Sequence, residues 1–168
     1  LLSLVLLGIH SYFGLEIIRR GIIFTDLAIG QMAALGSAVA VLFFDGEYHY
    51  VISLAFALIA AFLNSLAARR EKYLEAFIGL LYAFGVSGVF ILLSKSPHGM
   101  EEFQNLLAAD ILFTPMSEIL KVAVLYSFLG VAVWLINTKT KGFVKDFLFF
   151  ATFAFTVTSS VKLAGVLV

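Results

Sequence analysis

The sequence has 168 residues, of which 62% are hydrophobic and 13% are charged, and its formal net charge is zero. Soluble domains have about 45–50% apolar and about 25% charged residues, so this composition excludes an ordinary water-soluble domain and indicates a membrane protein. A neutral chain without a basic run excludes an electrostatic footprint for nucleic acid, and the absence of cysteine excludes disulfides and thiolate metal sites.

Six apolar blocks follow one another along the chain, and each is about long enough to cross a bilayer as a helix. We therefore predict an all-α, polytopic bundle of about six transmembrane helices that forms a single domain over residues 1–168. Because the chain starts and stops inside apolar runs, we expect it to be part of a longer membrane protein, truncated at both ends. The blocks are Leu1–Ile18, Gly21–Phe44, Val51–Ala68, Phe77–Leu93, Val122–Ile136 and Phe147–Val168.

Basic residues gather in every second connection between these blocks. An excess of Lys and Arg marks cytoplasmic loops, so the alternation predicts that the first, third and fifth spans run toward the cytoplasm. The connections on the opposite side of the membrane contain only two basic residues, Lys95 and Lys121. The basic connections hold Arg19, Arg20, Arg69, Arg70, Lys72, Lys139, Lys141 and Lys145.

The long fourth connection, Ser94–Lys121, contains one further helical pattern. Over Met100–Phe113 the apolar residues recur near one helical face, and the acidic residues lie elsewhere. We predict a short amphipathic helix at the outer membrane interface, ended by Pro115.

Asp26 is the residue of the second block that most needs an explanation, because a carboxylate within a span is costly unless it is paired, protonated or hydrated. One interpretation makes it a functional group of a transport path. The alternative is that it snorkels to the cytoplasmic boundary or pairs with Arg19 or Arg20. Gln31 follows deeper in the same block among small residues, a pattern that favours helix packing over ligand contact.

Two further polar residues interrupt apolar blocks. His10 in the first block could bind a divalent cation, although a single histidine in a bundle is more often an interhelical hydrogen-bond partner. Lys162 follows the polar run Thr158–Ser160 and precedes Gly165, which indicates a hydrated or broken helix. The other interpretation of Lys162 is a buried pair with Asp26.

Hydrolytic motifs and a nucleotide-binding P-loop are absent from the sequence. We therefore expect no enzymatic activity of its own and no bound cofactor. Any use of ATP would require a partner subunit.

The run Arg19–Gly36 resembles the second-helix signature of the ABC-3 permeases, the membrane subunits of bacterial zinc and manganese uptake systems. Two further stretches agree with the family in order and position: Ala108–Leu112 is similar to its Gly-Asp-Ile-Leu motif, and Val157–Val168 is similar to its small-polar stretch before Gly-Val-Leu. The resemblance therefore extends over nearly the whole chain.

The resemblance implies a multi-pass permease of the bacterial inner (cytoplasmic) membrane, embedded in lipid, that pairs with a second permease copy around a central path. It would take a divalent metal ion, of the zinc or manganese type, from a periplasmic or lipoprotein metal-binding protein, and a separate ATP-binding subunit would supply the energy. On this interpretation Asp26 contacts the metal. Gln31, Lys162 and His10 line the path or gate, and Arg19 with Arg20 marks the cytoplasmic boundary.

Two positions depart from the family pattern. Many members have a histidine four residues after the aspartate that corresponds to Asp26, whereas this chain has Gly30 there, with Gln31 beside it. The connection Asn137–Asp146 is shorter than the family's cytoplasmic segment that docks on the ATPase. Two other functions therefore stay open: a passive channel or secondary carrier, and a structural membrane subunit in which Asp26 and Lys162 only pair.

Overall fold

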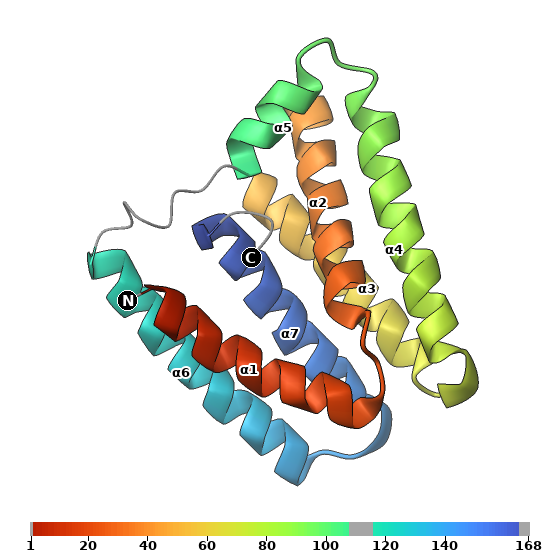
Figure 1. The fold of residues 1–168 in the computed structure, drawn as a ribbon, viewed down its shortest axis with the longest axis vertical. Helices are drawn as coiled ribbons and strands as arrows, with labels where there is room; N and C mark the ends of the chain where they lie inside the picture. The colour runs from red at the N-terminus through yellow and green to blue at the C-terminus, as the bar shows by residue number, and fades with distance from the viewer. Residues whose placement is uncertain (1, 108–115, 165–168) are drawn as a thin grey trace.

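The computed structural model describes residues 2–107 and 116–164, and only the backbone of residues 2, 71, 72, 102, 105–107, 118 and 161–164. Within these ranges the chain forms seven helices and no strand (Figure 1). The predicted all-α bundle is therefore confirmed. The helices are α1 (Leu2–Arg20), α2 (Thr25–Phe44), α3 (His49–Ala67), α4 (Glu71–Leu93), α5 (Gly99–Leu107), α6 (Met116–Lys139) and α7 (Gly142–Ala164).

Five helices of the described part are long and apolar enough to cross a membrane, namely α2, α3 and most of α4, α6 and α7. The chain is therefore a multi-pass membrane protein. The remaining predicted span, α1, has 19 residues but carries Glu16, Arg19 and Arg20 in its last two turns. These charges make it less apolar than the other five.

The turn between α1 and α2 is set by one glycine. Gly21 has a φ of +67°, a left-handed conformation that glycine adopts without steric cost. The N–H of Gly21 donates to the carbonyl of Ile18 at 3.1 Å, and the N–H of Ile22 donates to the carbonyl of Ile17 at 3.2 Å. This is the Schellman arrangement that closes many helices. The chain therefore leaves α1 at Arg20 and starts α2 only at Thr25.

The helices continue beyond the apolar blocks from which they were predicted. α6 exceeds the block Val122–Ile136 at both ends, because polar residues still form its backbone hydrogen bonds. At its C-terminal end the backbone N–H and the hydroxyl of Thr140 both donate to the carbonyl of Ile136, at 3.0 and 2.6 Å. The predicted connection Asn137–Asp146 is wrong in length, since only Thr140 and Lys141 lie between α6 and α7.

α2 is closely packed on two sides. Toward α3, a Cβ added to Gly36 would lie 2.7 Å from the Cα of Ser53, and the Ser53 hydroxyl donates to the carbonyl of Ala33 at 2.8 Å. Toward α4, a Cβ added to Gly85 would lie 2.9 Å from the backbone carbon of Gln31. The small-residue packing surface predicted for this helix is confirmed.

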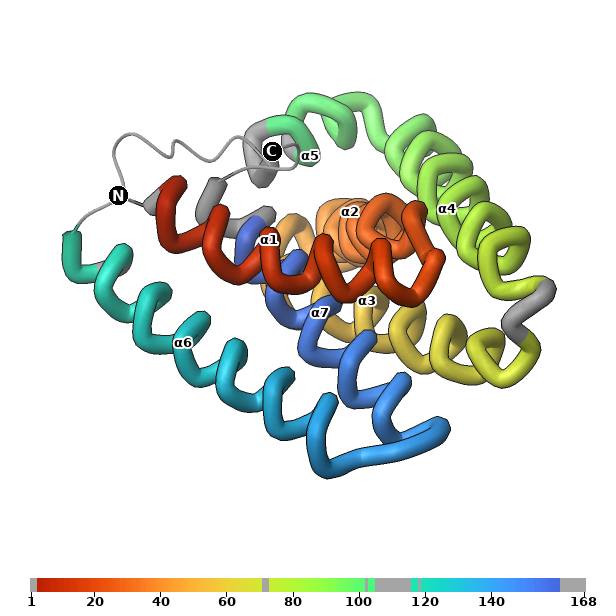
Figure 2. Tube along the Cα trace, turned by 60° about the horizontal axis from the view of Figure 1, so that its bottom comes forward, coloured from red at the N-terminus to blue at the C-terminus, as the bar shows by residue number. Residues whose placement is uncertain are grey.

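α7 lies between the group formed by α2, α3 and α4 and the pair formed by α1 and α6. It packs on α3 on one side and on α6 on the other (Figure 2). α1 lies against α6 and reaches α7 through aromatic contacts. The ring of Phe13, which is fully buried, lies 5.0 Å from that of Phe153 and 5.7 Å from that of Phe149. Asn137 Nδ2 of α6 also donates to the Tyr12 hydroxyl of α1 at 3.2 Å.

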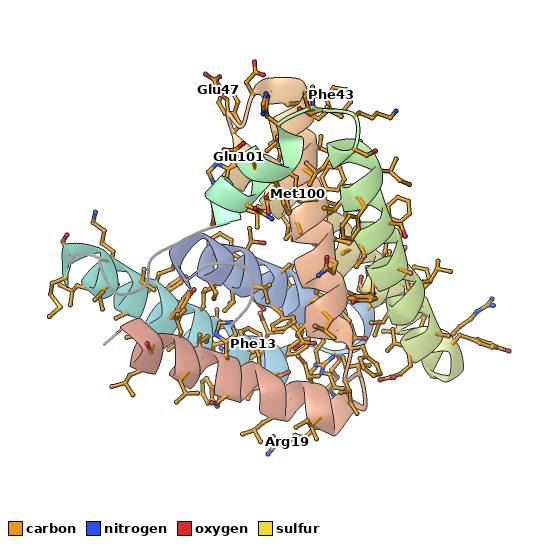
Figure 3. All side chains as sticks on the ribbon, turned by 45° about the horizontal axis from the view of Figure 1, so that its top comes forward. Phe13, Arg19, Phe43, Glu47, Met100 and Glu101 are labelled. Atoms are coloured by element: carbon orange, nitrogen blue, oxygen red, sulfur yellow. The ribbon has the colours of Figure 1, made fainter. Side chains whose placement is uncertain are left out.

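The basic connections lie together at one end of the bundle. Figure 1 shows that α1, α3 and α6 finish at the end where α2, α4 and α7 begin. We call this the basic end; Arg19 lies there, whereas Glu47 and Glu101 lie at the opposite end (Figure 3). Contacts hold this end together, since the guanidinium of Arg69, in the turn between α3 and α4, lies 4.5 Å from the ring centroid of Phe143 of α7. The grouping follows the predicted alternation, and the side of the membrane stays a prediction.

The amphipathic helix predicted over Met100–Phe113 is present as α5, Gly99–Leu107. Phe103 is buried against the bundle, whereas Met100, Glu101 and Gln104 are exposed. The rest of the predicted helix, from residue 108, lies outside the described residues.

Candidate functional site

Asp26 lies in the first turn of α2, at the basic end of the bundle. Its side chain is exposed, and its Oδ1 accepts the backbone N–H of Leu27 at 2.7 Å. Asp26 therefore lies at the positive end of the helix dipole. Asp26 forms no ion pair with any other side chain that the structure describes.

The two arginines that end α1 have other partners. Arg20 binds Glu16 at 3.2 Å and Asp146 of α7 at 2.8 Å, and its guanidinium lies 4.1 Å from the ring centroid of Phe149. Arg19 approaches Glu16 at 3.9 Å, with its side chain 77% exposed. The pairing of Asp26 with Arg19 or Arg20 that the sequence left open is not formed.

Gln31 lies one to two turns deeper in α2, where it packs against α4. Its Cβ lies 2.9 Å from the position that a Cβ of Gly85 would take, so no larger side chain fits at Gly85 without a shift. This contact supports the packing interpretation of Gln31. The neighbouring Gly30, four residues after Asp26, has open space around it, because a Cβ built there meets nothing within 4 Å.

Two buried polar side chains near Asp26 have no partners. Thr25 and Asn64 are both fully buried, and the Thr25 hydroxyl and both polar atoms of the Asn64 amide lack a hydrogen-bond partner within the described part of the chain. α2 and α3 are antiparallel, with Gly36 opposite Ser53. Thr25 precedes Gly36 in α2 by as many residues as Asn64 follows Ser53 in α3. Because the two helices are antiparallel, Thr25 and Asn64 therefore lie at the same level of the interface between α2 and α3. Buried polar groups normally have protein or water partners, and the Asn137 Oδ1 and Thr158 hydroxyl groups are further buried polar atoms without a partner among the described residues.

A polar cluster connects α1, α6 and α7 in the interior. Its centre is the hydroxyl of Ser160, which lies 3.2 Å from His10 Nε2 and 2.9 Å from the Tyr126 hydroxyl. Tyr126 is buried and also contacts the Ser159 hydroxyl at 3.0 Å. Both serine hydroxyls lie within hydrogen-bond distance of the Thr156 carbonyl, at 2.9 and 2.7 Å. His10 is thus an interhelical hydrogen-bond partner, the commoner of the two roles considered from the sequence.

The direction of the hydrogen bonds in this cluster depends on the charge of His10. Nδ1 lies 2.9 Å from the Leu6 carbonyl, which only accepts, so Nδ1 carries a hydrogen. In the neutral ring Nε2 is then an acceptor, and the Ser160 hydroxyl donates to it. In the charged ring Nε2 donates to Ser160, which can then donate to the Thr156 carbonyl. The cluster accommodates either state by rotation of one hydroxyl group.

Among the described residues, the structure does not place the side chain of the predicted path residue Lys162 or a metal-binding cluster in the site. The side chain of Lys162 lies outside the described residues, and only its backbone, within α7, is placed. No group of three or more His, Asp or Glu side chains that could hold a metal ion occurs in the described part of the chain. Asp26 is therefore a single exposed carboxylate that follows the buried Thr25 in the chain.

The comparisons with known proteins give no identification. No family model, no curated protein and no solved structure matches this chain.

The sequence pattern did not single out Tyr126, Thr25 or Asn64 as buried polar residues of the helix interfaces. Each lies in or beside an apolar block and differs from its surroundings by one polar group. Tyrosine is common in membrane helices, so Tyr126 gave no signal. The only available signal was Asn64, a polar amide in the block Val51–Ala68.

Proposed function

We propose that this chain is the permease subunit of an importer that moves a divalent metal ion, of the zinc or manganese type, across the bacterial inner membrane. A separate ATP-binding subunit supplies the energy, and a binding protein outside the membrane delivers the ion. The observation that carries the proposal is the exposed Asp26 in the first turn of α2, which forms no ion pair with a described side chain. The hydroxyl of Thr25, the residue before it, has no partner among the described residues. The resemblance of Arg19–Gly36 to metal-ion permeases supports it.

The chemistry of these groups suits an ion in transit. Asp26 offers a hard oxygen ligand, and the hydroxyl of Thr25 with the amide oxygen of Asn64 offers neutral oxygens. One carboxylate per chain does not complete a divalent site, so water molecules or a second copy of the chain supply the other ligands. The helix dipole at Asp26 also weakens its hold on a cation. A transport path needs such weak binding, because the ion has to leave as well as enter.

The test is metal uptake by the Asp26→Asn variant, measured at matched membrane abundance together with the ATP-binding subunit. The substitution keeps the size of the side chain and removes its charge. We expect uptake to fall at least about tenfold, which corresponds to the loss of roughly 1.4 kcal/mol of ion stabilisation. Glu47→Gln is the matched control, because Glu47 is an exposed carboxylate at the opposite end. Uptake at the wild-type level in Asp26→Asn would refute the role of Asp26.

A second variant adds a possible metal ligand near Asp26. Gly30→His places an imidazole one turn after Asp26, where an added Cβ meets nothing within 4 Å. We expect tighter binding of zinc or manganese to the purified chain, with Gly30→Ala as the control. Equal metal affinity in the two variants would contradict the assignment of this surface to the path.

The two alternatives make different predictions. A passive channel or secondary carrier would move the ion without ATP, so uptake would persist without the ATP-binding subunit. For a structural subunit, Asp26→Asn would lower thermal stability and leave uptake unchanged. Co-purification of an ATP-binding subunit with the chain favours the importer over both.

A further inference from the structure

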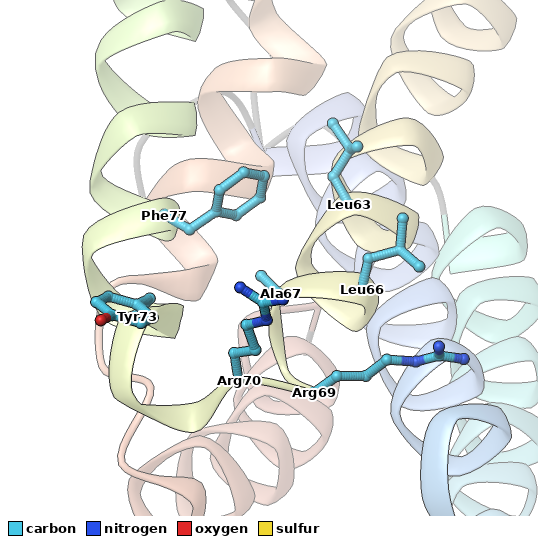
Figure 4. A pocket seen from close by; sticks show the side chains of 7 residues that line it. All are labelled: Leu63, Leu66, Ala67, Arg69, Arg70, Tyr73 and Phe77. Atoms are coloured by element: carbon cyan, nitrogen blue, oxygen red, sulfur yellow. The ribbon is translucent and has the colours of Figure 1, made fainter.

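A groove at the basic end lies between α3 and α4. It has a volume of about 480 Å³ and is lined by Leu63, Leu66, Ala67, Arg69, Arg70, Tyr73 and Phe77. This volume falls within the roughly 300–1,000 Å³ of sites that hold small molecules. Its walls are apolar, and its charged residues belong to the turn between the two helices (Figure 4).

The two arginines of the groove differ in what they contact. Arg69 turns away from the groove toward α7, where its guanidinium lies over the ring of Phe143. Arg70 points into the space between Ala67 and Phe77 (Figure 4). No carboxylate of the described side chains pairs with Arg70. The nearby Glu75 accepts the backbone N–H of Ile23 at 2.9 Å and so has another partner.

We propose that this groove binds an anionic phospholipid, with the lipid phosphate on Arg70 and an acyl chain along Leu63, Leu66 and Phe77. The proposal requires only that the helices lie in a membrane, so it stands or falls independently of metal transport.

The order of the lining residues matches the order of chemical groups in a lipid. Arg70 and Tyr73 lie at the end of the bundle, whereas Leu63 lies about one helical turn, roughly 6 Å, back from the end of α3 at Ala67. The groove therefore runs from a cationic mouth into an apolar interior, as a lipid runs from phosphate to hydrocarbon.

Charge selects the class of lipid. An arginine guanidinium binds a phosphate through two parallel hydrogen bonds, and basic pockets between transmembrane helices at the cytoplasmic side bind anionic headgroups. A zwitterionic lipid brings its own cation, which competes with Arg70 for the phosphate. Arg69, which lies at the same turn, adds to the positive potential at the mouth.

The experiment uses a tryptophan placed in the groove and lipids whose brominated acyl chains quench tryptophan fluorescence on contact. The chain has one tryptophan, Trp134, which lies exposed on α6. The reporter protein is the full chain with Trp134→Phe and Phe77→Trp, reconstituted in mixed vesicles. Quenching by brominated phosphatidylglycerol is compared with quenching by brominated phosphatidylcholine. No metal, ATP or ATP-binding subunit is present, so failure here leaves the proposed transport function untouched.

We expect phosphatidylglycerol to quench the reporter preferentially. Arg70→Gln should reduce this preference about fivefold, which corresponds to the ~1 kcal/mol that one basic residue contributes near an anionic membrane surface. Lys141→Gln is the matched control, because it removes one positive charge at the same end but away from the groove. It should leave the preference unchanged. Equal quenching by the two lipids, or an unchanged preference in Arg70→Gln, would overturn the proposal.

A second variant tests the apolar half of the site. Ala67→Phe fills the groove without changing any charge, and it should reduce quenching by phosphatidylglycerol. Glycerol phosphate, which has the headgroup chemistry without acyl chains, should not compete. Competition by glycerol phosphate, or undiminished quenching in Ala67→Phe, would make the groove a general anion site and overturn its assignment to a lipid.

Discussion

The close contact between α2 and α3 at Gly36 gives a quantitative prediction for the variant Gly36→Ala. The added methyl group would lie 2.7 Å from the Cα of Ser53 and 2.8 Å from the carbonyl oxygen of Ile52, whereas ordinary van der Waals contact begins at 3.4 Å. Both neighbours are backbone atoms that cannot rotate away. The two helices must therefore separate locally by about 0.7 Å, which also stretches the hydrogen bond from Ser53 to Ala33.

The expected loss of stability follows from these two effects. Overpacking a tight site costs about 1–3 kcal/mol. An interhelical hydrogen bond in a membrane protein contributes about 0.6 kcal/mol on average. Gly30→Ala, in the same helix, is the control, because its new Cβ meets nothing within 4 Å. The helix-propensity gain from glycine to alanine occurs in both variants, so it cancels in the comparison. Gly36→Ala should be about 1.5–3.5 kcal/mol less stable than Gly30→Ala.

The assay is unfolding by titration with a denaturing detergent, followed by the loss of helical signal and of a single species in size-exclusion chromatography. Both variants are measured in the same lipid–detergent mixture. If the two unfold at the same detergent fraction, the close packing of α2 on α3 is refuted.

Three further predictions concern the polar cluster, the basic end and the topology. Tyr126→Phe removes the hydroxyl that contacts Ser159 and Ser160 of α7, and it should lower the free energy of unfolding by about 0.5–1.5 kcal/mol. The control Tyr82→Phe, on α4, should leave the free energy of unfolding unchanged. Equal effects of the two substitutions would contradict a stabilising role of the polar cluster. Asp146→Asn breaks the ion pair between Arg20 of α1 and Asp146 of α7, and it should lower the free energy of unfolding by about 1 kcal/mol at low salt and by less at high salt. A loss of stability that does not depend on salt would contradict an electrostatic origin. An introduced Arg70→Cys should react with an impermeant thiol reagent only after the membrane is opened, and His98→Cys should react in intact cells; the reverse pattern would overturn the predicted orientation.

The sequence predicted the features that depend on local patterns along the chain. Runs of apolar residues locate membrane helices, because a span has to be apolar over its whole length. The alternation of basic connections predicted which helix ends lie together, and Arg20 with Asp146 shows that they do. α5 was also predicted, since amphipathic periodicity is a local property.

The depth of Asp26 was not predictable from apolarity alone. Residues 21–24 are apolar apart from the glycine and were assigned to the second span. The left-handed Gly21 closes α1 and turns the chain, so α2 begins at Thr25 and Asp26 falls in its first turn. Whether a glycine near an apolar run ends a helix depends on the packing around it, and here Ile22 is buried beside that turn.

The partners of the buried polar groups also lay beyond sequence reasoning. His10 and Ser160 are 150 residues apart in the chain, and only the crossing of α1 with α7 brings them within 3.2 Å. Helix crossings depend on the shapes of many side chains together, and no single residue encodes them. The same reason applies to Thr25 and Asn64, whose common level follows from the register of α2 on α3.

The distance along the chain between His10 and its partner has a consequence for biosynthesis. A ribosome that adds about 5–20 residues per second makes Ser160 about 8–30 s after His10, which is long compared with helix formation. During that interval the first helix can enter the bilayer while α7 has yet to be made. The bond between His10 Nδ1 and the Leu6 carbonyl is available at once, since it lies within α1, and it leaves only one ring nitrogen without a protein partner. The nascent chain therefore has an incomplete pair of α1 and α7 until α7 is inserted, and the His10 contact to Ser160 forms only then.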